Sequence, residues 1–143
     1  MKTTVRLSAF VFAALLALTA SVAAEPDTSD IAKSWRGTVH IRDGRPIPVQ
    51  LKIVKARLGD DAGTIRWGDP YRCESRLEYA AIENGVWDIT PRKSNGPFCD
   101  SVEGGEVLLK YTAGAKLEFQ LLAPKDRKVL QQTTLEADSP PRP

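Results

Sequence analysis

Short runs in which apolar and polar residues alternate cover most of the chain between Trp35 and Glu136. This period of two is the pattern of a β-strand that buries one face. The clearest example surrounds the turn sequence RDGRP, which Ile41 precedes and Ile47 follows. The pattern predicts eight strands, at residues 35–42, 47–53, 65–67, 71–79 with an extension to 82, 86–90, 106–112, 116–123 and 128–136.

Nearly all of these segments are joined by short sequences rich in turn residues, such as LGDDAG at 58–63 and ENG at 83–85. Short turns between consecutive strands favour an antiparallel meander, and closure into a barrel removes the exposed edges of that meander. We therefore expect an all-β domain over residues 34–136, an eight-stranded antiparallel meander that closes into a small barrel. A sandwich of two sheets is the alternative.

The segments on either side of this domain have different patterns. Residues 25–33 carry the one helix signal, between Asp27 and Lys33, with Asp27 or Thr28 as the cap. The tail at 137–143, ADSPPRP, is too rich in proline to pair in a sheet, and we expect it to be disordered.

The first 24 residues have the three regions of a secretory signal. Lys2 and Arg6 precede an apolar run of about 14 residues, and Val22-Ala23-Ala24 offers small residues for cleavage before Glu25. A membrane anchor is the alternative, but it needs roughly 20 apolar residues. The sequence thus predicts a periplasmic or secreted protein that is not inserted in a membrane after cleavage.

Removal of this segment also changes the charge. The chain has 20 basic and 18 acidic residues, and the loss of Lys2 and Arg6 brings the basic residues to 18. A protein that binds nucleic acid normally carries a sustained basic excess. The balanced charge argues against a nucleic-acid partner.

The stretch YRCESRLEY, residues 71–79, places Cys73 on the apolar face of a strand and charged side chains on the other face. Cys73 and Cys99 are the only cysteines, and in an exported chain we expect them to form a disulfide. A redox site is the alternative, but the 25 intervening residues do not match the Cys-x-x-Cys spacing of such sites. The charged face of the strand, with Arg72 and Glu74 at its start, is interpreted as scaffold.

Catalytic and metal-binding patterns are missing from the sequence. His40 is the only histidine, so a zinc site of the usual kind cannot form once the cysteines are paired. The chain has no Gly-x-Ser-x-Gly elbow, phosphate loop or His-Glu-x-x-His motif. We expect no catalytic residue, no metal and no cofactor, with His40 exposed; an enzyme that uses His40 or carboxylates is a further alternative.

The long loop predicted at 91–105 is the candidate functional segment, because Cys99 would fix it to the domain. Its sequence SNGPF ends in an aromatic residue, and charged and polar residues lie on both sides of it in the sequence. Protein interfaces often have such an aromatic anchor with a polar rim. Packing of Phe98 over the end of the barrel is the alternative. The candidate partner-binding residues are Arg92, Lys93, Asn95, Phe98, Asp100 and Glu103.

Several short motifs support a resemblance to a known class. GTIRW, then Cys73 with Leu77, then Cys99 followed by GGEVLL resembles small secreted bacterial β-domains with one disulfide, over about residues 35–136. Periplasmic lysozyme inhibitors are similar in size, compartment and single bridge, although their Ser-Gly-x-x-Tyr loop is not present here.

Together these features predict a non-enzymatic domain that binds another extracytoplasmic protein through the loop at 91–105, as an inhibitor or immunity protein would. The alternative function is a carrier of a small hydrophobic ligand inside the barrel. Trp35, Trp67 and Trp87 fall on or near inward positions, where they would either line such a cavity or fill it.

Overall fold

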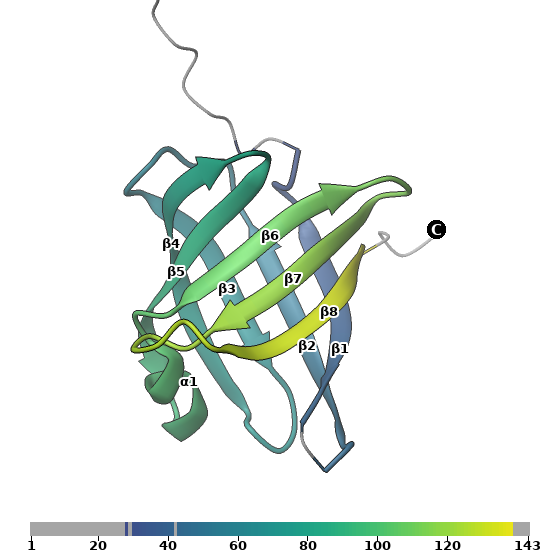
Figure 1. Ribbon diagram of the computed structural model, residues 1–143, viewed down its shortest axis with the longest axis vertical. Helices are drawn as coiled ribbons and strands as arrows, with labels where there is room; N and C mark the ends of the chain where they lie inside the picture. The colour runs from purple at the N-terminus through teal and green to yellow at the C-terminus, as the bar shows by residue number, and fades with distance from the viewer. Residues whose placement is uncertain (1–27, 29, 42, 139–143) are drawn as a thin grey trace, which may run out of the picture.

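The computed structural model describes residues 28, 30–41 and 43–138 (Figure 1). Eight antiparallel strands follow one another around a closed barrel, each paired with the next in the chain. The strands are β1 (Ser34–His40), β2 (Pro46–Ile53), β3 (Asp61–Trp67), β4 (Cys73–Glu83), β5 (Val86–Asn95), β6 (Glu106–Thr112), β7 (Lys116–Leu122) and β8 (Val129–Ala137), with the short helix α1 (Pro97–Val102) between β5 and β6. The predicted all-β meander and its closure into a barrel are confirmed, and the sandwich is excluded.

The interior of the barrel holds the apolar half of each alternating strand. In β2 every second residue, from Ile47 to Ile53, is buried. The bulkiest interior side chains are aromatic, and the most buried of them are at most 1% exposed. These are Trp35, Trp67, Tyr79 and Phe119, and Trp87 is 6% exposed. The three tryptophans therefore lie inward, as the alternation predicts.

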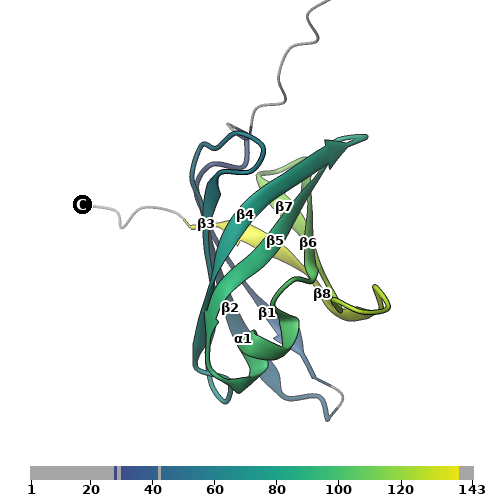
Figure 2. The same ribbon diagram turned by 90° about the vertical axis from the view of Figure 1, so that its left-hand side faces the viewer.

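The strands run between two ends of the barrel, and α1 lies at one of them (Figures 1 and 2). The connections at 41–45, 68–72, 96–105 and 123–128 meet at this end, which we call the α1 end. The connections at 54–60, 84–85 and 113–115 lie at the opposite end. Segments that are far apart in the sequence are thus brought together around α1.

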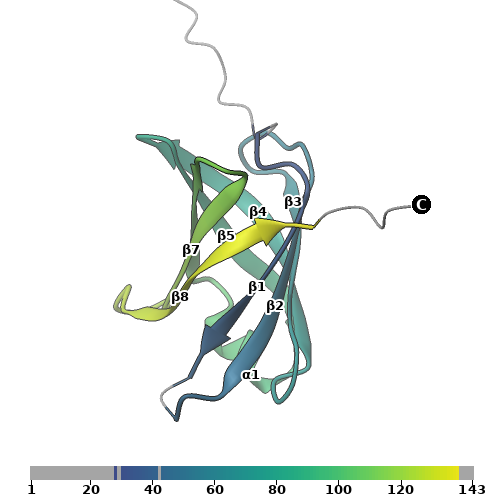
Figure 3. The same ribbon diagram turned by 90° about the vertical axis from the view of Figure 1, so that its right-hand side faces the viewer.

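The closure between β1 and β8 is looser than the other pairings. β1 pairs with β2 along its whole length, but its register with β8 covers only Trp35 with Ala137 and Arg36 with Glu136. Further along, the Thr133 hydroxyl donates a hydrogen bond to the Thr38 carbonyl at 2.7 Å. Figure 3 shows β8 turning away from β1 beyond this region. The two strands therefore separate as they approach the α1 end.

The segment expected to be a long loop at 91–105 is mostly regular. β5 continues through Pro91 to Asn95, and α1 follows at once. Pro91 is accommodated because the pairing of β6 with β5 ends at Ile89, so Pro91 has a strand partner only on β4. On its other side, its carbonyl accepts a hydrogen bond from the Gly104 N–H. Pro97 stands in the first turn of α1, where its missing N–H is not needed. The end of β5 and the short helix α1 thus occupy much of the segment that was predicted to be a loop.

The domain limits differ slightly from those predicted. Ala137 belongs to β8, and the Asp138 N–H donates to the Ser34 carbonyl, so the regular structure extends past residue 136. At 27–33, the Ile31 N–H donates to the Thr28 carbonyl, and the described residues make a turn and no helix; Asp27, the other predicted cap, lies outside the described residues. The predicted signal, its cleavage site and most of the tail lie outside the described residues. Within the described part of the chain, no helix is long and apolar enough to cross a membrane.

Candidate functional site

A disulfide fixes α1 to the barrel. Cys73, the first residue of β4, is bonded to Cys99 in α1, and both are buried. The bond predicted from the sequence is therefore confirmed. A helix of six residues is too short to be stable alone, so α1 depends on this bond and on its buried Val102. The disulfide thereby determines where the neighbouring Phe98 lies.

Phe98 belongs to a row of three aromatic rings at the α1 end. Its ring stacks on Tyr71 from the β3–β4 turn, with centroids 3.9 Å apart and planes at 5°. The Phe98 ring also packs edge to face against Trp67, with ring centroids 5.3 Å apart. Both arrangements are favourable for aromatic pairs. Of the two roles predicted for Phe98, the structure supports packing over the barrel end, because the ring is half-buried in this row.

A buried amide lies behind the aromatic row. Gln131 of β8 is only 6% exposed, and its Oε1 accepts a hydrogen bond from the Trp67 indole N–H at 3.0 Å. An indole N–H can only donate, so the amide oxygen must be the atom that faces Trp67. The amide nitrogen of Gln131 then points away from Trp67, with two hydrogens to donate.

These residues line a cleft of about 520 Å³ that is open to the surface, which we call the aromatic cleft. It lies where β1 and β8 separate, and residues of β1, α1, β8 and two turns contribute to it. Its lining is mainly apolar or aromatic, with a histidine and a carboxylate among the polar residues: His40, Ile41, Asp43, Tyr71, Phe98, Leu130 and Gln131. The volume is within the range of about 300 to 1,000 Å³ that is usual for ligand sites.

The rim of the aromatic cleft carries exposed apolar side chains. Val129 is 46% exposed and Leu130 is 43% exposed. The β7–β8 register shifts between Leu121 and Leu122, so Leu130 has no register partner on β7. Such a bulge bends the strand and redirects its side chains. Leu130 consequently faces the cleft and not the core.

The six residues predicted to contact a partner do not form one surface. Phe98 lines the aromatic cleft, whereas Arg92 lies on the outer face of β5 beside Glu78, at 3.7 Å. Glu103 accepts a hydrogen bond from the Ser94 N–H at 3.1 Å, so it holds the backbone near α1. Lys93 and Asp100 are exposed near α1.

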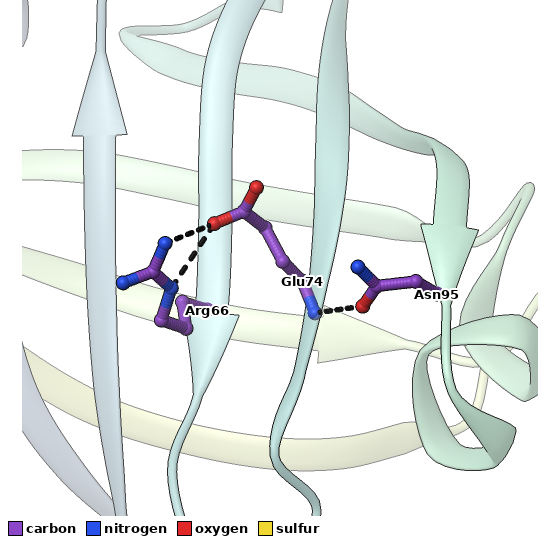
Figure 4. Close-up of polar contacts among 3 residues, drawn as sticks. All are labelled: Arg66, Glu74 and Asn95. Atoms are coloured by element: carbon purple, nitrogen blue, oxygen red, sulfur yellow. Dashed lines mark hydrogen bonds and ion pairs between the residues drawn. The ribbon is translucent and has the colours of Figure 1, made fainter.

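Asn95 has a similar structural role on the outer face of the sheet. Its Oδ1 accepts a hydrogen bond from the Glu74 N–H at 2.8 Å, and the Glu74 carboxylate accepts two from Arg66, at 2.7 and 3.0 Å (Figure 4). The three residues lie opposite one another in the register of β3, β4 and β5. Exposed ion pairs of this kind contribute little to stability, and this row fits the scaffold interpretation.

Arg72 departs from the predicted charged face of the strand. β4 begins at Cys73, so Arg72 lies in the preceding turn, where it donates to the carboxylate of Asp69. This hydrogen bond lowers the pKa of Asp69 below its usual value. The prediction placed Arg72 in the strand because its alternation with Cys73 looked continuous.

Five residues of the aromatic cleft were not identified from the sequence: Ile41, Asp43, Tyr71, Leu130 and Gln131. One local signal was present. In KVLQQ two apolar residues stand side by side, and a strand cannot bury both of them on one face. Tyr71 follows the turn sequence GDP and was counted as part of a strand.

Two of the polar groups at the aromatic cleft are exposed or already paired. His40 is exposed, as expected, and Asp43 is bound by both the backbone N–H and the side chain of Arg45, which lowers the pKa of Asp43. No group of three His, Cys, Asp or Glu side chains that could hold a metal ion occurs in the described part of the chain. A scan of protein-family models and searches of curated proteins and of solved structures found no match to this chain.

Asp88, which lies away from the aromatic cleft, has a carboxylate in a partly buried position that disfavours its charge. Asp88 of β5 is half-buried, and its Oδ1 has no hydrogen-bond partner in the described structure. Burial raises the pKa of Asp88, the nearby Glu106 raises it further, and Arg127 opposes the shift. The charged form of Asp88 is thus disfavoured in the folded protein.

We expect Asp88→Asn to stabilise the protein at about pH 7 and to have less effect at about pH 3. Below its usual pKa of 3.8, Asp88 is neutral in both the folded and the unfolded protein, so the folded state has no charge penalty. Above that value the carboxyl of Asp88 ionises more readily in the unfolded chain than in the folded protein, which destabilises the folded state. This destabilisation grows with pH until the raised pKa of the folded state is passed. Thermal unfolding of both proteins across this pH range measures the difference. A constant difference, or the same change with exposed Asp100→Asn, contradicts the prediction.

Proposed function

We propose that this protein is a non-enzymatic domain that binds another protein outside the cytoplasm, and that the aromatic cleft with Val129 and Leu130 is its contact surface. The contact thus involves Phe98, as expected from the sequence, but centres on the barrel end and not on the whole segment 91–105.

The observation that carries this proposal is the pair of exposed apolar side chains beside the aromatic cleft. Leu130 lines the cleft together with half-buried Tyr71 and Phe98, and Val129 precedes it in β8; each of the two is exposed by more than two fifths. Apolar and aromatic groups gathered in this way, with a polar rim, are typical of the energetic centre of a protein interface. Part of the rim is the ion pair between Asp43 and Arg45.

Two further features support the compartment and the kind of partner. A disulfide forms and persists in oxidising compartments, and the first 24 residues have the pattern of a secretory signal. A surface held rigid by a disulfide loses little conformational freedom when it binds. This rigidity suits an inhibitor or immunity protein, which must bind a target tightly.

The carrier alternative has less support. A ligand inside the barrel would compete for space with side chains such as Trp67, Tyr79 and Phe119, which are at most 1% exposed. The aromatic cleft, in contrast, opens at the surface, where a partner can reach it.

We expect Leu130→Asp to weaken partner capture by about tenfold or more, because it places a charge in the apolar contact. The protein from Glu25 onward is immobilised and exposed to increasing amounts of envelope extract, and the bound partner is quantified. Leu58→Asp is the matched control, since Leu58 is 47% exposed but lies at the opposite end of the barrel.

Circular dichroism and thermal unfolding check that both variants are folded. Saturable capture that Leu130→Asp abolishes and Leu58→Asp preserves supports the proposal. No saturable capture, or equal capture by the two variants, overturns it.

A further inference from the structure

Gln131 is an unusual residue for the place that it occupies. It lies at a buried position of β8, where the alternation requires an apolar residue, and it is 94% removed from solvent. The Trp67 indole N–H donates to the amide oxygen, and no hydrogen bond from Nε2 is found within the described part of the chain. Nε2 is not one of the fully buried atoms that lack a partner there, so it is not sealed in the core.

The unpaired donor of Gln131 belongs to a residue that lines the aromatic cleft. The bond from Trp67 fixes the orientation of the amide, so Nε2 is held away from the core. Of the other polar groups that line the cleft, Asp43 is bound to Arg45, and His40 lies on an exposed position of β1. The amide of Gln131 therefore offers a neutral hydrogen-bond donor, held in place by Trp67, beside aromatic and apolar groups.

This combination selects its occupant by chemistry. Aromatic walls favour an aromatic side chain, which gains pairing energy beyond its buried area. A neutral N–H donor next to them suits a carbonyl oxygen. A polypeptide residue such as phenylalanine or tyrosine supplies both groups together, the ring from its side chain and the carbonyl from its own backbone.

The surrounding backbone also suits a polypeptide. The register pairing of β1 with β8 covers only Trp35 and Arg36, and the Thr133 hydroxyl bonds the Thr38 carbonyl further along. Beyond that bond, toward the cleft, the facing edges of the two strands have no register partner in the described structure. A free strand edge binds an extended chain through backbone hydrogen bonds, with specificity from pockets for alternate side chains. The aromatic cleft would be such a pocket.

Resting on the proposed function, we infer that the aromatic cleft receives one aromatic residue from an extended segment of the partner protein. The ring lies against Tyr71 and Phe98, and the backbone carbonyl of that residue accepts a hydrogen bond from Gln131 Nε2. Leu130 covers the inserted ring from the rim.

The experiment uses N-acetyl-phenylalaninamide, which carries a ring and backbone carbonyls, as the probe. The probe is titrated into the ¹⁵N-labelled protein, and the side-chain NH₂ signals of Gln131 are followed by NMR. We expect saturable shifts of these signals at millimolar probe. Phenethylamine lacks the carbonyls and N-acetylglycinamide lacks the ring, so each should bind at least about fivefold more weakly.

Two variants test the two contacts separately. Gln131→Glu keeps an oxygen that accepts the bond from Trp67 but removes the N–H donors, and Phe98→Leu removes an aromatic wall without changing Gln131. Each should weaken probe binding by about fivefold. If Gln131→Glu does not fold, the shift of the Gln131 NH₂ signals in the unchanged protein decides the matter.

The possible failures can be told apart. If the probe leaves the Gln131 signals unmoved, or binds Gln131→Glu as well as the parent, the inference is wrong, while partner capture that depends on Leu130 still supports the proposed function. If the probe moves these signals but Leu130→Asp and Leu58→Asp capture partner equally, the proposed function fails and the cleft is a site for small aromatic amides.

Discussion

Replacing Gly63 by alanine is expected to destabilise the barrel by roughly 2 to 5 kcal/mol, since it combines backbone strain with overpacking. Gly63 lies in β3 with φ at +124°, a conformation that other residues rarely adopt. An added Cβ would lie 1.9 Å from the carbonyl oxygen of Lys52 and 2.9 Å from its carbonyl carbon. The obstacle is the backbone of β2, which cannot move without disturbing the pairing of β2 with β3.

The β-bulge explains why the chain has this conformation at Gly63. The register between β3 and β4 shifts between Asp61 and Gly63, which leaves an extra residue on β3. The Gly63 N–H donates to the Asp61 carboxylate at 3.0 Å, so the bulge is held by a side chain two residues before it. Bulges bend a strand and increase its twist, as closure of a small barrel requires.

Gly114→Ala is the matched control for Gly63→Ala. Gly114 lies in the β6–β7 turn with φ at +79°, but no atom would lie within 4 Å of an added Cβ. Its substitution therefore adds strain alone, about 1 kcal/mol. Urea denaturation followed by tryptophan fluorescence gives the free energy of unfolding of each variant. Equal losses in the two variants would show that the contact with Lys52 has no energetic consequence.

The strands and the barrel could be predicted because their signal is local. The alternation at 47–53 corresponds to β2, and the turn sequence before it corresponds to the β1–β2 connection. Each strand of a closed meander pairs with its neighbours in the chain, so short turns suffice to indicate the topology. The burial of Trp35 followed from the same alternation.

The structure around α1 could not be predicted because it depends on tertiary contacts. Pro91 signalled the end of a strand, but it is tolerated where β6 no longer pairs with β5. The helix PFCDSV has no repeating pattern long enough to be recognised, and the bond to Cys73 stabilises it from outside the segment. In both places, long-range contacts decide the local structure.

The aromatic cleft was beyond prediction for the same reason. Its residues come from the end of β1 and the β1–β2 turn, from the β3–β4 turn, from α1 and from β8, which are far apart in the sequence. Only the closure of the barrel brings Ile41, Tyr71, Phe98 and Leu130 together. The sequence drew attention to Phe98, but it did not indicate which surface its ring would join.

Loss of the disulfide is expected to destabilise the protein by about 3 kcal/mol, because the bond restricts the unfolded chain. Cys73 and Cys99 are 26 residues apart in the sequence, so the reduced chain regains the freedom of a loop of that size. Urea denaturation with and without reductant measures the change. The double variant Cys73→Ser/Cys99→Ser is the control, since reductant should not affect it.

Reduction should loosen α1 before the rest of the barrel. Without the bond, Val102 is the remaining buried residue of α1 that is not a cysteine, whereas each strand keeps its ladders. Hydrogen exchange in α1 and proteolysis at residues 94–98 should therefore accelerate in the reduced protein under conditions where β2 and β7 stay protected.

The same loosening should reach the contact surface, because α1 carries Phe98, one wall of the aromatic cleft. Partner capture by the reduced protein should fall toward that of Leu130→Asp, since the wall must be ordered again at each binding event. Uniform loosening of all strands on reduction would contradict the role given to α1. Free thiols in the protein as it is exported would contradict the pairing itself and, with it, the rigid cleft on which partner binding depends.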